Sequence, residues 1–206
     1  MTERSSLRHH IGEPYLLFLV FAGVGLGTIL VHQNVRLTVL WVVLVFLSVL
    51  FRSVQEVQFT FSASSLWRGA LLGLVISVPV LAFLSGQLRS FAERLYAADD
   101  AVLLFYQICF VSAPVEEYFF RGIVQSRKGW LVSSGLYAAA GLVYFLPHTP
   151  FVVALIAAAV MGVLGLVYAY VCDQHGLTAS VGCHVVVGLI LQVMPSLVAS
   201  LRTMLA

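Results

Sequence analysis

Charged residues are scarce in this sequence. The 9 acidic and 11 basic residues make up 10% of its 206 residues, whereas a typical soluble domain has about 25%. Hydrophobic residues account for 61%, which leaves too few polar side chains to cover a surface in water. The small net charge of +2 argues against a nucleic-acid partner. A lipid bilayer is the solvent that fits this composition, so we expect an integral membrane protein.

Cysteine is also scarce, and two well-known catalytic motifs are absent. The three cysteines, Cys109, Cys172 and Cys183, lie in or beside apolar segments, and their odd number argues against a disulfide framework. The GxSxG pattern of a serine nucleophile and the HExxH pattern of a zinc-binding helix do not occur. Neither a serine hydrolase of that type nor an HExxH metalloprotease is therefore predicted.

Long apolar runs dominate what is present. A helix needs about 20 apolar residues to cross the hydrocarbon core, and seven runs meet or approach that length. Continuous runs differ from the alternating pattern of a membrane barrel. We therefore predict an all-α fold, a polytopic transmembrane helical bundle of about seven spans. The predicted spans are residues 14–32, 35–51, 66–85, 101–120, 130–147, 151–172 and 177–199.

Basic residues between these runs predict the orientation. Short cytoplasmic loops carry an excess of Lys and Arg. With a cytoplasmic N-terminus, seven basic residues lie inside and four outside, which favours that orientation. The inside set is Arg4, Arg8, Arg52, Arg68, Arg121, Arg127 and Lys128, and the outside set is Arg36, Arg89, Arg94 and Arg202.

Two adjacent acids occupy an apolar segment, residues 113–121. An ionised side chain at mid-membrane costs at least about 2.5–3.5 kcal/mol, so such residues are informative. Adjacent carboxylates repel each other, and one should keep its proton to higher pH, as a general acid or base requires. Glu117 can pair with Arg121 at i, i+4, while Glu116 points about 100° away toward another role. The alternative is a Glu–Arg pair that only anchors a helix end.

One histidine lies at the end of a later predicted span and another lies within the last one. His148 stands between Pro147 and Pro150 at the end of the fifth span and, taken alone, would be an ordinary interfacial histidine. His184 lies about a third of the way into the last span, where its imidazole needs a hydrogen-bond partner inside the bundle. The alternative for His184 is a bond to a carbonyl of a neighbouring helix. The polar turn 173–175 is interpreted as solvated.

Two carboxylates and two imidazoles can act together on one water molecule. A glutamate helped by a histidine deprotonates the water, the hydroxide attacks a peptide carbonyl, and the other histidine donates to the oxyanion. Glu116, His148 and His184 could instead hold zinc with one open position. Adjacent glutamates would make a cramped ligand set, so we favour a mechanism without a metal or another cofactor.

Three motifs resemble the CPBP family of intramembrane proteases. The first is EExxxR at Glu116–Arg121, the second is Tyr144–His148 with Tyr where the family usually has Phe, and the third begins at His184. The resemblance covers residues 101–199, about half of the chain. The family includes CAAX prenyl endopeptidases of the Rce1 type and bacterial proteins tied to bacteriocin self-immunity.

The resemblance implies a role for each motif residue. Glu116 and His148 would activate the water, and His184 would help to form the oxyanion hole. Glu117 and Arg121 would orient the first glutamate and brace the helix. The family usually has Asn or Asp four residues after the last histidine, where this chain has Gly188. Loss of one oxyanion donor typically costs about 10²–10³ in rate.

We therefore predict an intramembrane endopeptidase that cleaves a membrane-associated protein or peptide, located in a bacterial cell (inner) membrane. The alternative is a non-enzymatic immunity or scaffold protein on the same fold, and Gly188 is its best support. A proton-coupled transporter is disfavoured, because no matching halves occur. The predicted organisation is an N-terminal part, 1–100, with three spans and an interfacial helix near 87–100, a catalytic core, 101–199, and a tail, 200–206.

Overall fold

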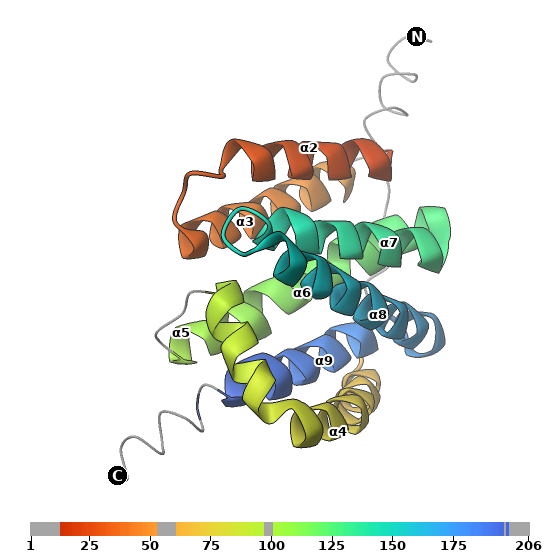
Figure 1. Ribbon diagram of the computed structural model, residues 1–206. Coiled ribbons are helices and arrows are strands. Elements are labelled where there is room, and N and C mark those ends of the chain that lie inside the picture. The colour runs from red at the N-terminus through yellow and green to blue at the C-terminus, as the bar shows by residue number, and fades with distance from the viewer. Residues whose placement is uncertain (1–12, 53–60, 97–100, 196, 198–206) are drawn as a thin grey trace, which may run out of the picture. The chain divides into compact units, whose positions relative to one another are not determined.

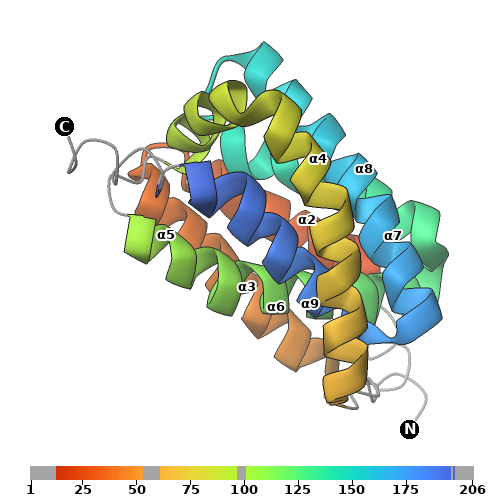
Figure 2. The ribbon, with the colours of Figure 1, turned by 90° about the horizontal axis from the view of Figure 1, so that it is seen from below.

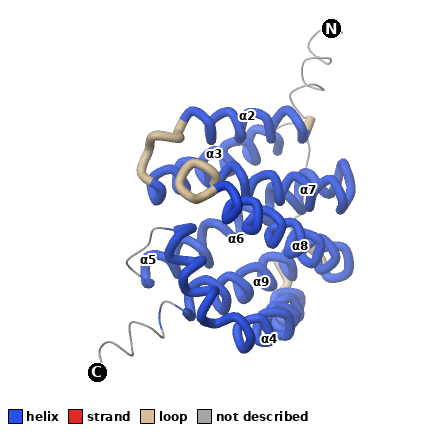
Figure 3. The backbone as a smooth tube through the Cα atoms, in the orientation of Figure 1, coloured by secondary structure: helices blue, strands red, loops and turns tan. Residues whose placement is uncertain are grey.

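The computed structural model describes residues 13–52, 61–96, 101–195 and 197. These residues form helices joined by short turns and no strands, which confirms the all-α prediction (Figure 3). Three of the helical segments, labelled η, have the wider π-helical turn. The elements are α2 (Pro14–Gly27), α3 (Gln33–Arg52), α4 (Ala63–Tyr96), α5 (Ala101–Tyr106), η1 (Gln107–Ser112), α6 (Ala113–Glu117), η2 (Tyr118–Gln125), α7 (Ser126–Phe145), α8 (Phe151–His175), α9 (Leu177–Gly188) and η3 (Leu189–Val193).

Four helical stretches among the described residues are long and apolar enough to cross a membrane: Gln33–Phe51, Ala63–Leu88, Val102–Phe145 and Phe151–His175. The predicted count of about seven spans is not confirmed. The predicted spans 101–120 and 130–147 lie within one helical run of 44 residues. The first and last predicted spans correspond to shorter apolar helices, Pro14–Gly27 and Leu177–Val193.

The segment that joins the two merged spans is helical where the sequence suggested a loop. Residues 121–128 continue as η2 and the start of α7. The helix is interrupted at Gly129, whose φ of 81° lies in the left-handed region that favours glycine. The predicted interfacial helix likewise continues α4 to Tyr96, beyond a bend at Leu84 with φ −123°.

Two of the basic residues used to predict the orientation lie in the interior. Arg36 is 1% exposed and Arg121 is 2% exposed, so neither is a loop charge. Without Arg121 the number of inside basic residues falls from seven to six, and without Arg36 the number of outside basic residues falls from four to three. The orientation with a cytoplasmic N-terminus stays a prediction, and Arg4, Arg8 and Arg202 lie outside the described residues.

The chain divides into two compact units, and the first comprises residues 1–59 and 118–170. In its described part, α2 packs against α3 and α7, and η2 packs against α3 and α7 (Figure 1). Gly25 permits the contact of α2 with α7, because a side chain there would collide with Val143. This unit carries Arg121 and His148.

The second unit comprises residues 60–117 and 171–206. Figures 1 and 2 both show α4 running beside α9. The two backbones approach closely at glycines, as small residues allow in membrane helices. A Cβ at Gly182 would lie 2.6 Å from the Leu66 carbonyl, and one at Gly73 would lie 2.7 Å from the Cys183 carbonyl. This unit carries Glu116, Glu117 and His184.

These compact units do not test the predicted organisation into residues 1–100 and 101–199, which stays a prediction. The predicted tail, 200–206, lies outside the described residues.

Candidate active site

The two glutamates lie on α6, a five-residue helix between the π-helical segments η1 and η2. Pro114 on this helix has no N–H to donate to the carbonyl four residues earlier. π-Helical turns are rare and occur frequently at functional sites. Glu116 is 3% exposed and Glu117 is fully buried. Both acids therefore lie in the interior, where a carboxylate needs hydrogen-bond donors.

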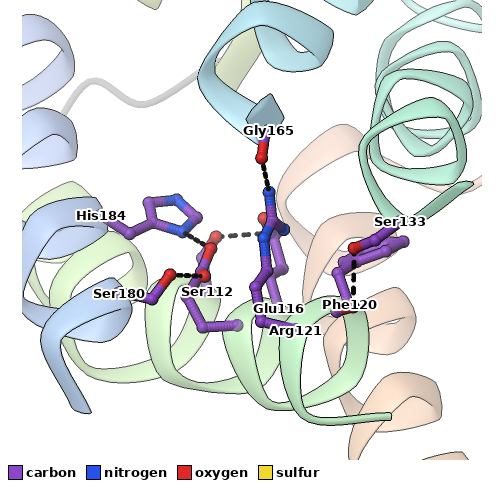
Figure 4. A network of polar contacts seen from close by, with 9 residues as sticks. Ser112, Glu116, Phe120, Arg121, Ser133, Gly165, Ser180 and His184 are labelled. Carbon is purple, nitrogen blue, oxygen red and sulfur yellow. Dashed lines mark hydrogen bonds and ion pairs between the residues drawn. The ribbon is translucent and has the colours of Figure 1, made fainter. Parts of the chain in front are cut away.

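Glu116 receives one such hydrogen bond from the preceding turn. The Ser112 hydroxyl donates to its Oε1 at 2.8 Å, and Ser112 is itself buried (Figure 4). The sequence predictions did not include Ser112. The signal was present, because Ser112 precedes Glu116 by four residues on one helical face. The contact fixes one carboxylate oxygen of Glu116.

Glu117 is bound by two side chains of α9. Nδ1 of His184 lies 2.9 Å from Oε1 of Glu117, and the Ser180 hydroxyl donates to Oε2. All three residues are buried, and His184 and Ser180 point toward the same carboxylate (Figure 4). His184 thus contacts a carboxylate. The alternative considered from the sequence was a hydrogen bond to a backbone carbonyl of a neighbouring helix. Ser180, missed by the sequence predictions, precedes His184 by four residues.

The contact with Glu117 determines what the second ring nitrogen of His184 can do. A neutral imidazole that donates Nδ1–H to the carboxylate carries a lone pair on Nε2, whereas an imidazolium carries a proton on both nitrogens. When both ring nitrogens carry protons, Nε2 can donate to another group while Nδ1 donates to Glu117. The carboxylate of Glu117 can then balance the positive charge of that form in the interior.

Arg121 is a buried cation of the first unit. Its Nη2 donates to the Gly165 carbonyl at 3.0 Å (Figure 4). Its guanidinium carbon lies 4.5 Å from the centre of the Tyr137 ring and 5.4 Å from that of Tyr168. Aromatic faces attract a desolvated cation. These contacts join η2 to α7 and α8.

His148 lies in the turn between α7 and α8, and its side chain is exposed. Its backbone N–H donates to the Phe145 carbonyl at 3.1 Å. The part of the ring that packs on the turn loses hydration, which lowers the pKa of His148 below 6.5. The positive charges of Arg36 and His32 lower this pKa further, whereas a hydrogen bond with the Val31 backbone raises it. A neutral imidazole can accept a proton, as a general base must.

The predicted site residues are distributed over both compact units. The second unit brings Glu117 together with His184, and Glu116 together with Ser112. Arg121 and His148 belong to the first unit. No group of three or more His, Cys, Asp or Glu side chains that could hold a metal ion occurs among the described residues. Metal dependence and the catalytic roles both stay predictions.

Gly188, the position without the expected amide side chain, lies where α9 meets η1. A Cβ at Gly188 would lie 2.5 Å from Cγ2 of Ile108, which is closer than real Cβ atoms approach other atoms. Ile108 is 1% exposed and cannot move toward solvent. The glycine therefore lets these segments pack, and its presence has a local steric reason.

We expect Gly188→Asn to destabilise the protein, because an overpacked site typically costs about 1–3 kcal/mol. Thermal unfolding in detergent should show a lower midpoint for this variant. Ile108→Ala removes the opposing atoms, so the double variant should be more stable than the sum of the two single effects. An unchanged midpoint in Gly188→Asn would contradict the steric explanation.

Comparison with known proteins adds one finding. The model of the family described as type II CAAX prenyl endopeptidase Rce1-like matches residues 98–190. The match covers just under half of the chain and includes the three motifs that contain Glu116, His148 and His184. No curated protein and no solved structure shows significant similarity.

Proposed function

We propose that this chain, whose residues 98–190 belong to the Rce1-like family of type II CAAX prenyl endopeptidases, hydrolyses a peptide bond with a water molecule activated by Glu116. The family is one of CPBP intramembrane proteases, and the apolar helices are those of an integral membrane protein. Its substrates are accordingly membrane-associated proteins or peptides. The observation that carries the proposal is the buried carboxylate of Glu116, held at one oxygen by Ser112.

The proposed first step is a proton transfer from water to Glu116. The carboxylate, held by the Ser112 hydroxyl, accepts the proton while the water oxygen attacks the peptide carbonyl carbon. His148, with its lowered pKa, is a neutral base that assists this step. The proton then passes from Glu116 to the leaving nitrogen as the C–N bond breaks. The products are a carboxylic acid and an amine, so water is the only co-reactant.

The proposed role of His184 is to stabilise the oxyanion. Nε2–H of the imidazolium donates to the negative oxygen, and Glu117 holds the opposite side of the ring at Nδ1. The two adjacent glutamates then have different functions. Glu116 moves the proton, and Glu117 is a positioning residue that keeps His184 oriented and charged. Arg121 braces η2 through Gly165.

We further propose that the reaction needs no metal. Glu116 and Glu117 are adjacent and would make a cramped ligand set for zinc. A strong chelator such as EDTA or 1,10-phenanthroline should therefore leave the cleavage rate of the purified protein unchanged. Loss of activity that returns on addition of Zn²⁺ would contradict this part of the proposal.

The non-enzymatic immunity or scaffold protein remains the second candidate, favoured by the missing side chain at Gly188. A variant in which Glu116, His148 and His184 are all replaced distinguishes the two functions. Membranes that contain equal amounts of this variant or of the wild type are compared for new peptide termini. An endopeptidase creates new peptide termini only in the wild type. A scaffold would give identical termini in both membranes, and its biological effect would survive the substitutions.

A further inference from the structure

Arg36 is a buried cation outside the segment that matches the family. It lies on α3 and is 1% exposed. Burying a guanidinium among apolar helices is costly unless its N–H groups are satisfied. Three backbone carbonyls of the first unit accept hydrogen bonds from it. Nη1 donates to Tyr144 at 2.6 Å, and Nη2 donates to Gly25 at 3.0 Å and to Val143.

The carbonyls of Val143 and Tyr144 have lost their usual helical donors. The donor for Val143 would be the N–H of residue 147, which is a proline and has none. The donor for Tyr144 would be the N–H of His148, which instead bonds the Phe145 carbonyl at 3.1 Å. The last carbonyls of a helix also carry its negative dipole end. Arg36 thus supplies both the donors and the positive charge that the end of α7 requires.

Two more contacts join the α2–α3 hairpin to the same turn. Nε2 of Gln33 also donates to the Tyr144 carbonyl, at 3.2 Å. The imidazole of His148 forms a hydrogen bond with the backbone of Val31, in the turn between α2 and α3. The hairpin therefore contacts both the backbone that leads into the His148 turn and the imidazole that the turn carries.

We propose that Arg36, supported by Gln33, is a positioning residue that fixes the His148 turn, so that the N-terminal hairpin is part of the catalytic apparatus. The inference rests on the proposed function, because it assigns His148 a part in the chemistry. Arg36 acts through the backbone of residues 143–148 and touches no reacting atom. Its loss should therefore change the placement of His148 more than the binding of substrate.

The test compares Arg36→Gln with Lys128→Gln. Lys128 is a matched control, because it also ties α7 to the N-terminal segment, through an ion pair with Glu13 at 2.9 Å, but at the other end of α7. Misplacing a catalytic group by about 1 Å costs about 10²-fold. We expect Arg36→Gln to lower kcat by about that factor while KM stays nearly unchanged. Arg36→Lys keeps a positive charge and should retain part of the kcat that Arg36→Gln loses. Lys128→Gln should leave kcat unchanged.

A second readout does not depend on activity. Modification of His148 by diethyl pyrocarbonate, followed by mass spectrometry, should be faster in Arg36→Gln, while the rate at His175 stays constant. Wild-type kcat and an unchanged modification rate in Arg36→Gln would overturn the inference. If Arg36→Gln does not fold, the test uses Gln33→Ala, which should show a smaller decrease that is confined to kcat. Wild-type kcat in Gln33→Ala would then overturn the inference. Failure of the proposed function is distinct, because the wild type would then show no cleavage.

Discussion

Glu116→Gln is expected to lower kcat by about 10²–10⁴-fold, the usual contribution of a positioned general base. The amide has the shape of the carboxylate and can still accept the Ser112 hydroxyl proton, so the variant should insert and fold. It cannot take a proton from water. The measurement is the cleavage rate of a membrane-associated peptide by purified variant and wild type at equal concentrations.

Two variants control for indirect effects of this substitution. Ser112→Ala removes the hydrogen bond to Oε1 but keeps the base, so its kcat should lie between those of Glu116→Gln and the wild type. Glu116→Asp keeps a carboxylate on a shorter side chain and should also be intermediate. Cleavage by Glu116→Gln at the wild-type rate would show that another group activates the water.

The second large effect is expected at the Glu117–His184 pair. His184→Gln removes the proposed oxyanion donor, and such a loss typically lowers kcat by about 10²–10³-fold. Glu117→Gln keeps an oxygen that can accept from Nδ1 but removes the charge that supports the imidazolium, so it should lower kcat by a similar factor. Single-turnover rates of both variants and of the double variant provide the measurement.

The double variant shows whether the two residues act as one unit. Groups that act together have non-additive effects, so it should be little slower than either single variant. Ser180→Ala, which removes only the contact with Oε2 of Glu117, should have a smaller effect. Multiplicative losses in the double variant would mean that Glu117 does not act through His184.

The all-α fold was predictable from the long apolar runs, because a helix satisfies the hydrogen bonds of its own backbone N–H and C=O groups in lipid. The number of membrane spans was not predictable in this way. Hydropathy windows treat the more polar residues after Phe120 as a loop, whereas the backbone continues through them as η2 and α7. The π-helical turns of η1 and η2 also do not follow the ordinary helical period and were not visible in the sequence.

The sequence singles out candidate site residues but not all of their contacts. Local spacing predicts a pair of Glu117 with Arg121, and it cannot reveal the contact of Glu117 with His184, which is 67 residues away in the sequence. Arg36 appeared to be a loop charge, because a charge count does not distinguish a buried cation from an exposed one. Pro147 was the available signal, since its missing N–H leaves a carbonyl near the end of α7 that needs another donor.

The origin of the oxygen in the product tests the central claim most directly. Purified wild type in lipid vesicles is incubated with a membrane-associated peptide in H₂¹⁸O, and the products are analysed by mass spectrometry. Hydrolysis by an activated water predicts one ¹⁸O atom in each new C-terminal carboxylate, formed at least about 10²-fold more slowly by Glu116→Gln. Equal formation of labelled product by wild type and Glu116→Gln, or no cleavage by either, would contradict the account.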